Sequence, residues 1–338
     1  KTQASNADVL VMYGKTELRA GNVEDAVFYF KEAVKKAPES METLYFLGVA
    51  LRESGSLDGA RKIFEEILRK NPDHVSSQLE LARIHAATGG LAKAQEYCER
   101  ADKKSREVKD MSTQFDAHRL LASIALKRDD LGGYKKELEL TIQINPDDEA
   151  ALLDLAAVED KLGHAEAALN YLDKFHGRGK NFTPAFYVAY LELLLKAEQG
   201  PRAKEVAIEA VEHHADDPSL MLLRGRTLEA TGESFAAREV YEAVVVAHPQ
   251  IGETYLRLGR VKRADRDFEG AISTLKTGAE KVENNTPLLK ELVAVYVEIR
   301  DHNSATATLE EILQRDPKDS ETRFQLAKLL QARGYTED

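Results

Sequence analysis

Residues 41–72, METLYFLGVALRESGSLDGARKIFEEILRKNP, contain the pattern that decides the fold of this chain. In the first half of this stretch, Leu44, Leu47 and Leu51 recur at helical spacing, so their side chains share one face of a helix. Gly55 follows directly and predicts the end of that helix, because glycine is a common residue just past a helix terminus.

The second half of the stretch repeats the same apolar pattern. Ala60, Phe64 and Ile67 share one helical face, and Asn71-Pro72 predicts the helix end, because proline disfavours helical backbone at the residue before it. The stretch therefore predicts two short amphipathic helices joined by a tight turn.

This unit recurs along the chain with a period of 34 residues. A small residue lies where each first helix meets its partner, since small side chains let two helices approach closely. These positions are Gly14, Gly48, Ala82, Ala122, Ala156, Gly225, Gly259 and Ala327, with Leu194 and Val293 as departures. The second helices carry an alanine column, which is Ala26, Ala60, Ala94, Ala168, Ala237, Ala271 and Ala305. A fixed period of this length predicts a solenoid of stacked helix pairs.

In spacing and residue types, these units resemble the tetratricopeptide repeat (TPR). We count nine full copies and one half copy, which cover nearly all of the 338 residues. The resemblance implies an all-α fold, a right-handed superhelical solenoid of antiparallel helix pairs. It also implies a concave groove that is lined by the first helices and binds a protein partner.

The copies predict the organisation of the chain. Residues 1–7 form a lead-in, and residues 8–179 contain copies one to five, with extra residues at 109–114 and 176–183. Residues 180–338 contain copies six to nine and a terminal half repeat. The chain starts without an initiator methionine or signal peptide, and we expect that the native protein continues past its last residue.

The two insertions have different sequence characters. Residues 109–114 follow a charged stretch that favours a solvated loop; a second helix that runs on and a docking element are the alternatives. The other insertion contains Gly177 and Gly179, which favour a loop or hinge, with an anion-binding loop as the alternative. We therefore predict bending or flexing near these glycines.

Composition excludes several classes of function. The net charge of −11 and pI of about 5.5 argue against non-specific nucleic-acid binding, which needs a basic surface. No apolar run is long enough to span a bilayer, so we expect no direct membrane span. The single cysteine, Cys98, excludes an intrachain disulfide and any multi-cysteine zinc site. Both a cytoplasmic and a bacterial periplasmic location fit this composition, and oligomeric state is not predicted.

The sequence predicts no catalytic, cofactor or metal site. The nine histidines show no HExxH spacing, and no GxSxG, GxGxxG or Walker motif occurs. Cys98 occupies an apolar column, which predicts a buried residue rather than a nucleophile. His213-His214 are predicted at a helix end, where cations suit the helix dipole.

The remaining candidate is the concave surface of the first helices. Its C-terminal half is basic and its middle is apolar, which predicts a groove for an extended or helical peptide with acidic residues. The alternative is that the arginines pair with acids such as Glu229 on adjacent repeats. The predicted partner-binding residues are Arg83, Arg119, Leu153, Leu191, Leu195, Arg226, Arg260, Arg263, Lys290 and Lys328.

These observations favour a non-catalytic protein–protein interaction scaffold. Long TPR arrays of this kind resemble parts of bacterial exopolysaccharide-export and envelope-assembly proteins, and this resemblance implies a role in such an assembly. One alternative is the TPR arm of a larger enzyme whose catalytic domain lies outside this segment. A second is a cytoplasmic adaptor or co-chaperone without a carboxylate clamp, because Val11, Lys15 and Phe46 do not match the lysine and asparagine columns of that clamp.

Overall fold

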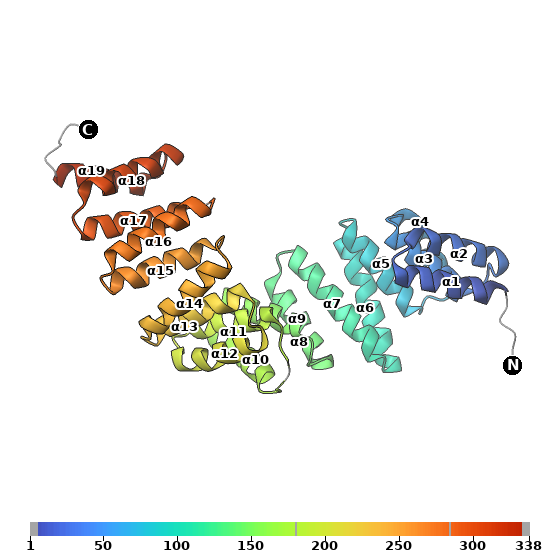
Figure 1. Ribbon diagram of the computed structural model, residues 1–338. Helices are drawn as coiled ribbons and strands as arrows, with labels where there is room; N and C mark the ends of the chain where they lie inside the picture. Colours follow the sequence, from blue (N-terminus) through green and yellow to red (C-terminus); the bar gives the residue numbers. More distant parts are fainter. Residues whose placement is uncertain (1–5, 180, 284, 333–338) are drawn as a thin grey trace. The chain divides into compact units, whose positions relative to one another are not determined.

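A computed structural model describes residues 6–179, 181–283 and 285–332 (Figure 1). Every regular element in these residues is an α-helix, and there are nineteen, which agrees with nine and a half helix pairs. They are α1 (Asn6–Ala20), α2 (Val23–Lys36), α3 (Met41–Glu53), α4 (Leu57–Lys70), α5 (Val75–Ala87), α6 (Leu91–Val108), α7 (Met111–Lys127), α8 (Leu131–Ile144), α9 (Glu149–Lys161), α10 (Ala165–His176), α11 (Pro184–Lys196), α12 (Gly200–His213), α13 (Pro218–Ala230), α14 (Ser234–Ala247), α15 (Gly252–Ala264), α16 (Phe268–Lys281), α17 (Thr286–Glu298), α18 (His302–Arg315) and α19 (Ser320–Ala332). The odd-numbered elements are the first helices of the repeats, and the even-numbered elements are the second helices.

The helices divide into two compact units, residues 1–164 and 165–338. Within each unit, helices that follow one another in sequence pack together. First helices of neighbouring repeats also touch, as in α1–α3, α3–α5 and α5–α7 of the first unit and α11–α13 and α15–α17 of the second. No pair of second helices has comparable contacts in the described residues. We call the surface formed by the first helices of a unit its first-helix face.

Where the small-residue column holds glycine, the first helix lies against a large side chain of its own second helix. A Cβ atom placed on Gly48 would lie 2.7 Å from the ring of Phe64, which is closer than side chains pack. Phe64 is fully buried, and so is Ala60, one turn before it on α4. Gly225 and Tyr241 have the same relationship in the second unit. The predicted columns are therefore the contact between the two helices of a repeat.

Turn chemistry explains the paired acids. Asp129 adopts a left-handed backbone with φ of 56°, where the second repeat has Gly55 with φ of 79°. Asp130 then caps α8, because its carboxylate accepts the amide hydrogen of Gly133. The carboxylate of Asp148 caps α9 in the same way.

The first insertion extends two helices instead of forming the predicted loop. Helix α6 has 18 residues where α4 has 14, and α7 has 17 residues where α5 has 13. Lys109 turns the chain with φ of 58°, and Asp110 caps α7 through Thr113. The inserted residues thus add about one helical turn to each helix, and the repeat columns resume unchanged.

The second insertion is attached to the core at its end. Phe182 is buried at 3% exposure, and its ring packs against those of Phe186 (4.5 Å) and Phe175 (5.4 Å). Nε2 of His214 donates to the carbonyl oxygen of Phe182 at 2.8 Å. Bending near Gly177 and Gly179 stays a prediction, but Phe182 limits its local extent because a buried aromatic must keep its contacts.

The helix bounds correct the register of the sixth repeat. Helices α11 and α13 both begin with proline and have 13 residues, so the residue equivalent to Gly225 is Leu191. Leu194, which the sequence pattern predicts at this position, lies three residues further along α11. Leu191 is fully buried, as this column requires.

Candidate partner-binding face

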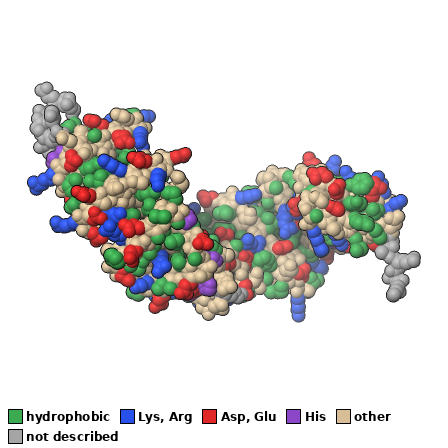
Figure 2. All heavy atoms as spheres, in the orientation of Figure 1, with side chains coloured by type: hydrophobic (Ala, Val, Ile, Leu, Met, Phe, Trp, Pro, Cys, Tyr) green, Lys and Arg blue, Asp and Glu red, His purple; other side chains and the backbone are tan. Residues whose placement is uncertain are grey.

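The first-helix faces are rich in charged side chains. On the side visible in Figure 2, acids and bases are interspersed, and no large field of one sign is seen. Most of the predicted cations lie next to an acidic side chain, as the distances below show.

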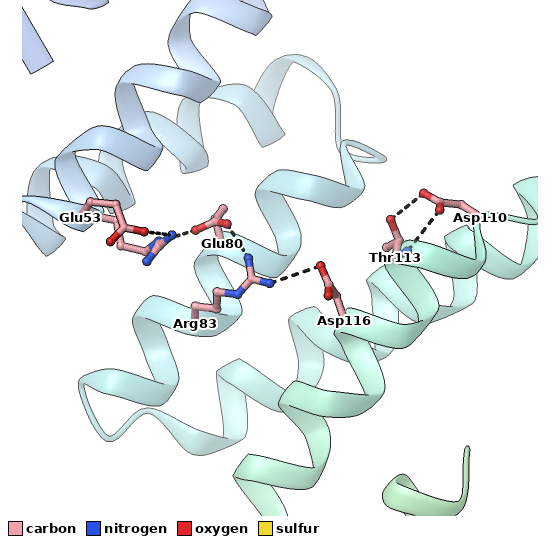
Figure 3. A network of polar contacts seen from close by, with 7 residues as sticks. Glu53, Glu80, Arg83, Asp110, Thr113 and Asp116 are labelled. Carbon is pink, nitrogen blue, oxygen red and sulfur yellow. Dashed lines mark hydrogen bonds and ion pairs between the residues drawn. The ribbon is translucent and has the colours of Figure 1, made fainter. Parts of the chain in front are cut away.

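In the first unit, a buried carboxylate connects cations from two repeats (Figure 3). Glu80 on α5 is only 3% exposed. Its Oε2 accepts from Nε of Arg52 on α3 at 2.5 Å, and its Oε1 accepts from Arg83 at 2.6 Å. Arg83 also reaches Asp116 on α7 at 3.4 Å. We call this set the Glu80 ladder, and it links the first helices of three successive repeats.

The Glu80 ladder affects the pKa of a neighbouring side chain, Tyr45. Burial raises the pKa of Tyr45, and the negative charge of Glu80 raises it further, so the hydroxyl stays neutral at physiological pH. Arg119, the next predicted cation, pairs with Asp148 at the start of α9 at 3.3 Å.

The second unit contains an equivalent arrangement. Glu291 on α17 is 8% exposed and accepts from Nε of Arg260 at 2.8 Å and from Arg263 at 2.6 Å. Both arginines belong to α15, so this Glu291 ladder joins two repeats. Arg226 lies 3.6 Å from Glu192, and Lys290 lies 3.0 Å from Asp319.

Six of the predicted cations therefore pair with acids of a neighbouring repeat, as in the alternative reading of the sequence. They are Arg83, Arg119, Arg226, Arg260, Arg263 and Lys290. Lys328 differs: it is exposed and has no ion-pair partner among the described residues. Leu153 and Leu195 are half-buried, whereas the fully buried Leu191 belongs to the core.

An apolar cavity of about 460 Å³ lies on the first-helix face at the end of the second unit. We call it the α17–α19 pocket. Lys290, Lys328, Gln325 and His302 contribute its polar lining, and none of the described residues that line it carries a carboxylate. The apolar lining residues are Val293, Ala294, Val297, Leu309 and Leu329. This pocket was not predicted from the sequence. A signal was present, because Ala294 and Val297 are small or apolar at the two positions where the preceding repeat has arginines.

A second cavity, of about 520 Å³, lies between α6, α7 and α8 and was also missed. One lining residue, His118, is buried, with Nδ1 2.7 Å from Glu137 and Nε2 3.4 Å from Asp102. Arg106 lies on the same side and pairs with Asp102 at 2.9 Å. The acids around His118 are thus already engaged by side chains of the cavity itself.

Reactive groups are scarce in the described part of the chain. No group of three or more His, Cys, Asp or Glu side chains there could hold a metal ion. Cys98 is fully buried as predicted, and burial raises the pKa of its thiol to about 12. A thiol with this pKa is almost entirely protonated at neutral pH, so it is a poor nucleophile.

Comparison with known proteins agrees with the repeat architecture. A tetratricopeptide repeat family model matches residues 12–73 and 192–251, and a second tetratricopeptide repeat model matches residues 51–124. The chain belongs to the tetratricopeptide repeat family. None of the described helices combines the length and apolarity that a membrane crossing requires.

Curated relatives of this TPR chain are distant and much longer. The Protein CTR9 homolog of Arabidopsis thaliana is 23% identical over 86% of this chain. Cellulose synthase operon protein C of Pseudomonas fluorescens is 21% identical over 97% of it. The TPR chain spans only 26% and 27% of these two proteins, respectively.

A solved structure supports the same fold. It is described as the functional characterization of Pseudomonas aeruginosa pilF, and it matches with a TM-score of 0.51 at 15% identity. The match covers 63% of this chain and 94% of that one. At this identity the likeness indicates the fold alone.

Proposed function

We propose that this TPR chain is a non-catalytic protein–protein interaction scaffold whose first-helix faces bind a segment of a partner protein. The observation that carries the proposal is the α17–α19 pocket, an apolar recess of about 460 Å³ on one of these faces. Its size lies within the range of about 300–1,000 Å³ that is usual for binding pockets.

The ladders support the same proposal. Because Glu80 and Glu291 are buried, they hold the surrounding arginines in fixed positions before any partner arrives. A surface that is ordered in advance loses less conformational entropy on binding. Arg260 still exposes 52% of its side chain, so it can contact a partner without leaving the ladder.

We further propose that the scaffold serves a bacterial envelope or exopolysaccharide-export assembly. In support, the alignment with Cellulose synthase operon protein C extends over 97% of the chain. The second candidate is an adaptor within a different multi-subunit complex. It is favoured by the similarity of 43% of the chain to Anaphase-promoting complex subunit 7 of Arabidopsis thaliana, at 27% identity.

Site-specific photo-crosslinking in cells of the source organism tests the scaffold function. A benzophenone amino acid would replace Met12, Leu126 or Val297, which are exposed on first helices. Phe235 and Val246, exposed on the second helix α14, are the matched control sites. We expect one or more proteins to crosslink from the first-helix sites and not from the controls. Crosslinks from the control sites alone would contradict binding on the first-helix face.

The crosslinked partner also separates the candidates for the assembly. A partner encoded with polysaccharide-export genes would support the envelope assignment. A partner from a cytoplasmic complex would support the adaptor instead.

A further inference from the structure

We propose that the α17–α19 pocket binds an acidic, apolar peptide segment, with one aliphatic or aromatic side chain in the pocket and a neighbouring carboxylate on Lys328. This inference rests on the proposed scaffold function and names the chemistry of the partner at one position.

The pocket exists because the last repeat interface lacks a ladder. The Glu291 ladder uses Arg263 of one first helix and Glu291 of the next. In the next copy, 34 residues later, the same two columns hold Val297 and Gln325. Neither side chain carries a charge, so the space that an ion pair fills at Glu291 is an open apolar recess.

The lining of the recess fits an apolar side chain. Val293, Ala294 and Leu329 form part of its wall, and Val297 is 44% exposed. Burial of such a surface by a partner is favourable by about 25 cal/mol for each Å² of apolar area. An exposed recess of this composition is typical of an interaction site.

The rim determines the charge of the partner. Lys290 and Lys328 lie on neighbouring first helices, and the described residues that line the pocket include no acid, although the chain as a whole has a net charge of −11. Lys290 is held by Asp319 at 3.0 Å and Glu321 at 3.4 Å, whereas Lys328 has no acid beside it in the described residues. Complementarity therefore favours a carboxylate close to the apolar anchor.

Peptide selection on the intact chain tests the inference. A phage-displayed library of random peptides would be selected on the wild-type protein, and the enriched peptides would be synthesised with a fluorophore for anisotropy titrations. We expect a consensus that places Asp or Glu next to Leu, Ile, Met or Phe. Binding should fall at least about tenfold in Val297→Asp/Lys328→Glu, which corresponds to a loss of about 1.4 kcal/mol.

Val246→Asp/Lys281→Glu is the matched control, because it makes the same chemical changes at exposed positions of the second helices α14 and α16. It should leave the affinity unchanged. The single variant Lys328→Gln should weaken binding less than the double variant does, and it should reduce the salt dependence of binding. This milder variant keeps the test valid if the double variant fails to fold.

Three results of the peptide selection would overturn the pocket assignment. They are the absence of any enriched peptide, a consensus without acids, and equal binding by the pocket and control variants. A homodimer that is lost in Val297→Asp would also overturn it, because a second copy would then occupy the pocket. The scaffold function fails separately, through the photo-crosslinking pattern.

Discussion

Two regions of the first-helix faces, the Glu80 ladder and the α17–α19 pocket, use the same positions in opposite ways. At the ladder, the carboxylate of Glu80 bridges Arg52 and Arg83 across the interface between two repeats. At the pocket, Val297, Gln325 and Lys328 occupy the same three columns, and Lys328, the one charged residue of the three, has no ion-pair partner in the part of the chain that the structure describes. The difference indicates that the same positions of a repeat interface can hold either an ion-pair network or an apolar pocket, while the packing of the helices is the same in both.

The largest expected effects concern that common scaffold. Ala60→Leu in the first unit and Ala305→Leu in the second each place a larger side chain in the fully buried alanine column. Overpacking should lower the free energy of unfolding by about 1–3 kcal/mol in both cases. Urea denaturation followed by circular dichroism would measure it. An unchanged midpoint for either variant would mean that its alanine does not form the close helix contact.

The next prediction breaks the ladder. Glu80→Gln removes the charge between Arg52 and Arg83 and should destabilise the first unit by about 1–2 kcal/mol, because hydrogen bonds to charged groups are worth more than neutral ones. The loss of stability in Glu80→Gln is kept small because both arginines are partly exposed, so water can hydrate them when the carboxylate is gone. Glu53→Gln is the control, since Glu53 is 47% exposed, and it should change stability by less than about 0.5 kcal/mol.

Cys98 can assign this effect to one unit. It is the single cysteine of the chain and is buried in α6 of the first unit, so a thiol reagent reaches it only after local opening. Glu80→Gln should accelerate its labelling under native conditions, whereas Glu291→Gln in the second unit should leave the rate unchanged. Equal acceleration by both would argue that the two units open together.

A smaller effect is expected when the pocket is converted into a ladder. Val297→Arg/Gln325→Glu introduces the pair that Arg263 and Glu291 form one repeat earlier. A partly exposed ion pair should add only about 0.2–1 kcal/mol of stability, and less at high salt. The same variant should lose binding of the selected peptides. Retained peptide affinity would contradict the equivalence of the two sites.

The smallest expected effect is a pH dependence at the start of α19. The amide and hydroxyl of Thr322, and then Lys290, lower the pKa of Asp319 well below its usual value. A lowered folded-state pKa means that Asp319 stabilises the fold above the unfolded pKa of about 4, and that this contribution is lost as pH falls toward the lower folded value. Urea midpoints below pH 4 should therefore fall less steeply in Asp319→Asn than in the wild type. Identical pH profiles would exclude this contribution.

The sequence was sufficient to predict the helices and most columns, because a period of 34 residues repeated nine times leaves little freedom of register. It was insufficient where the period changes. The charged residues near 109–114 suggested a loop, yet α6 continues to Val108, Lys109 and Asp110 form a tight turn, and α7 begins at Met111. Before the sixth repeat, the sequence does not show how many of the inserted residues belong to the loop and how many to the next helix. The predicted helix register was therefore three residues too far along, at Leu194 instead of Leu191.

The site was only partly predictable for a physical reason. Arg83 and Arg263 were correctly placed on first helices, but Glu80 and Glu291 were not identified as their buried partners. A glutamate on a helix is usually exposed, so its burial is visible only after neighbouring repeats are stacked. One signal was present: each of these glutamates lies two residues before the small-residue column, 28 residues after an arginine of the preceding copy.

The extended α6–α7 hairpin has a practical consequence for protein engineering. The additional turns of α6 and α7 do not disturb the packing of the repeats that follow. The number of residues at the tip of this hairpin can therefore change without changing the contacts between repeats. The turn at Lys109 is therefore a permissive site for the insertion of an epitope or a fluorescent domain. Such a fusion would let the scaffold be followed in living cells with both termini and the α17–α19 pocket unmodified.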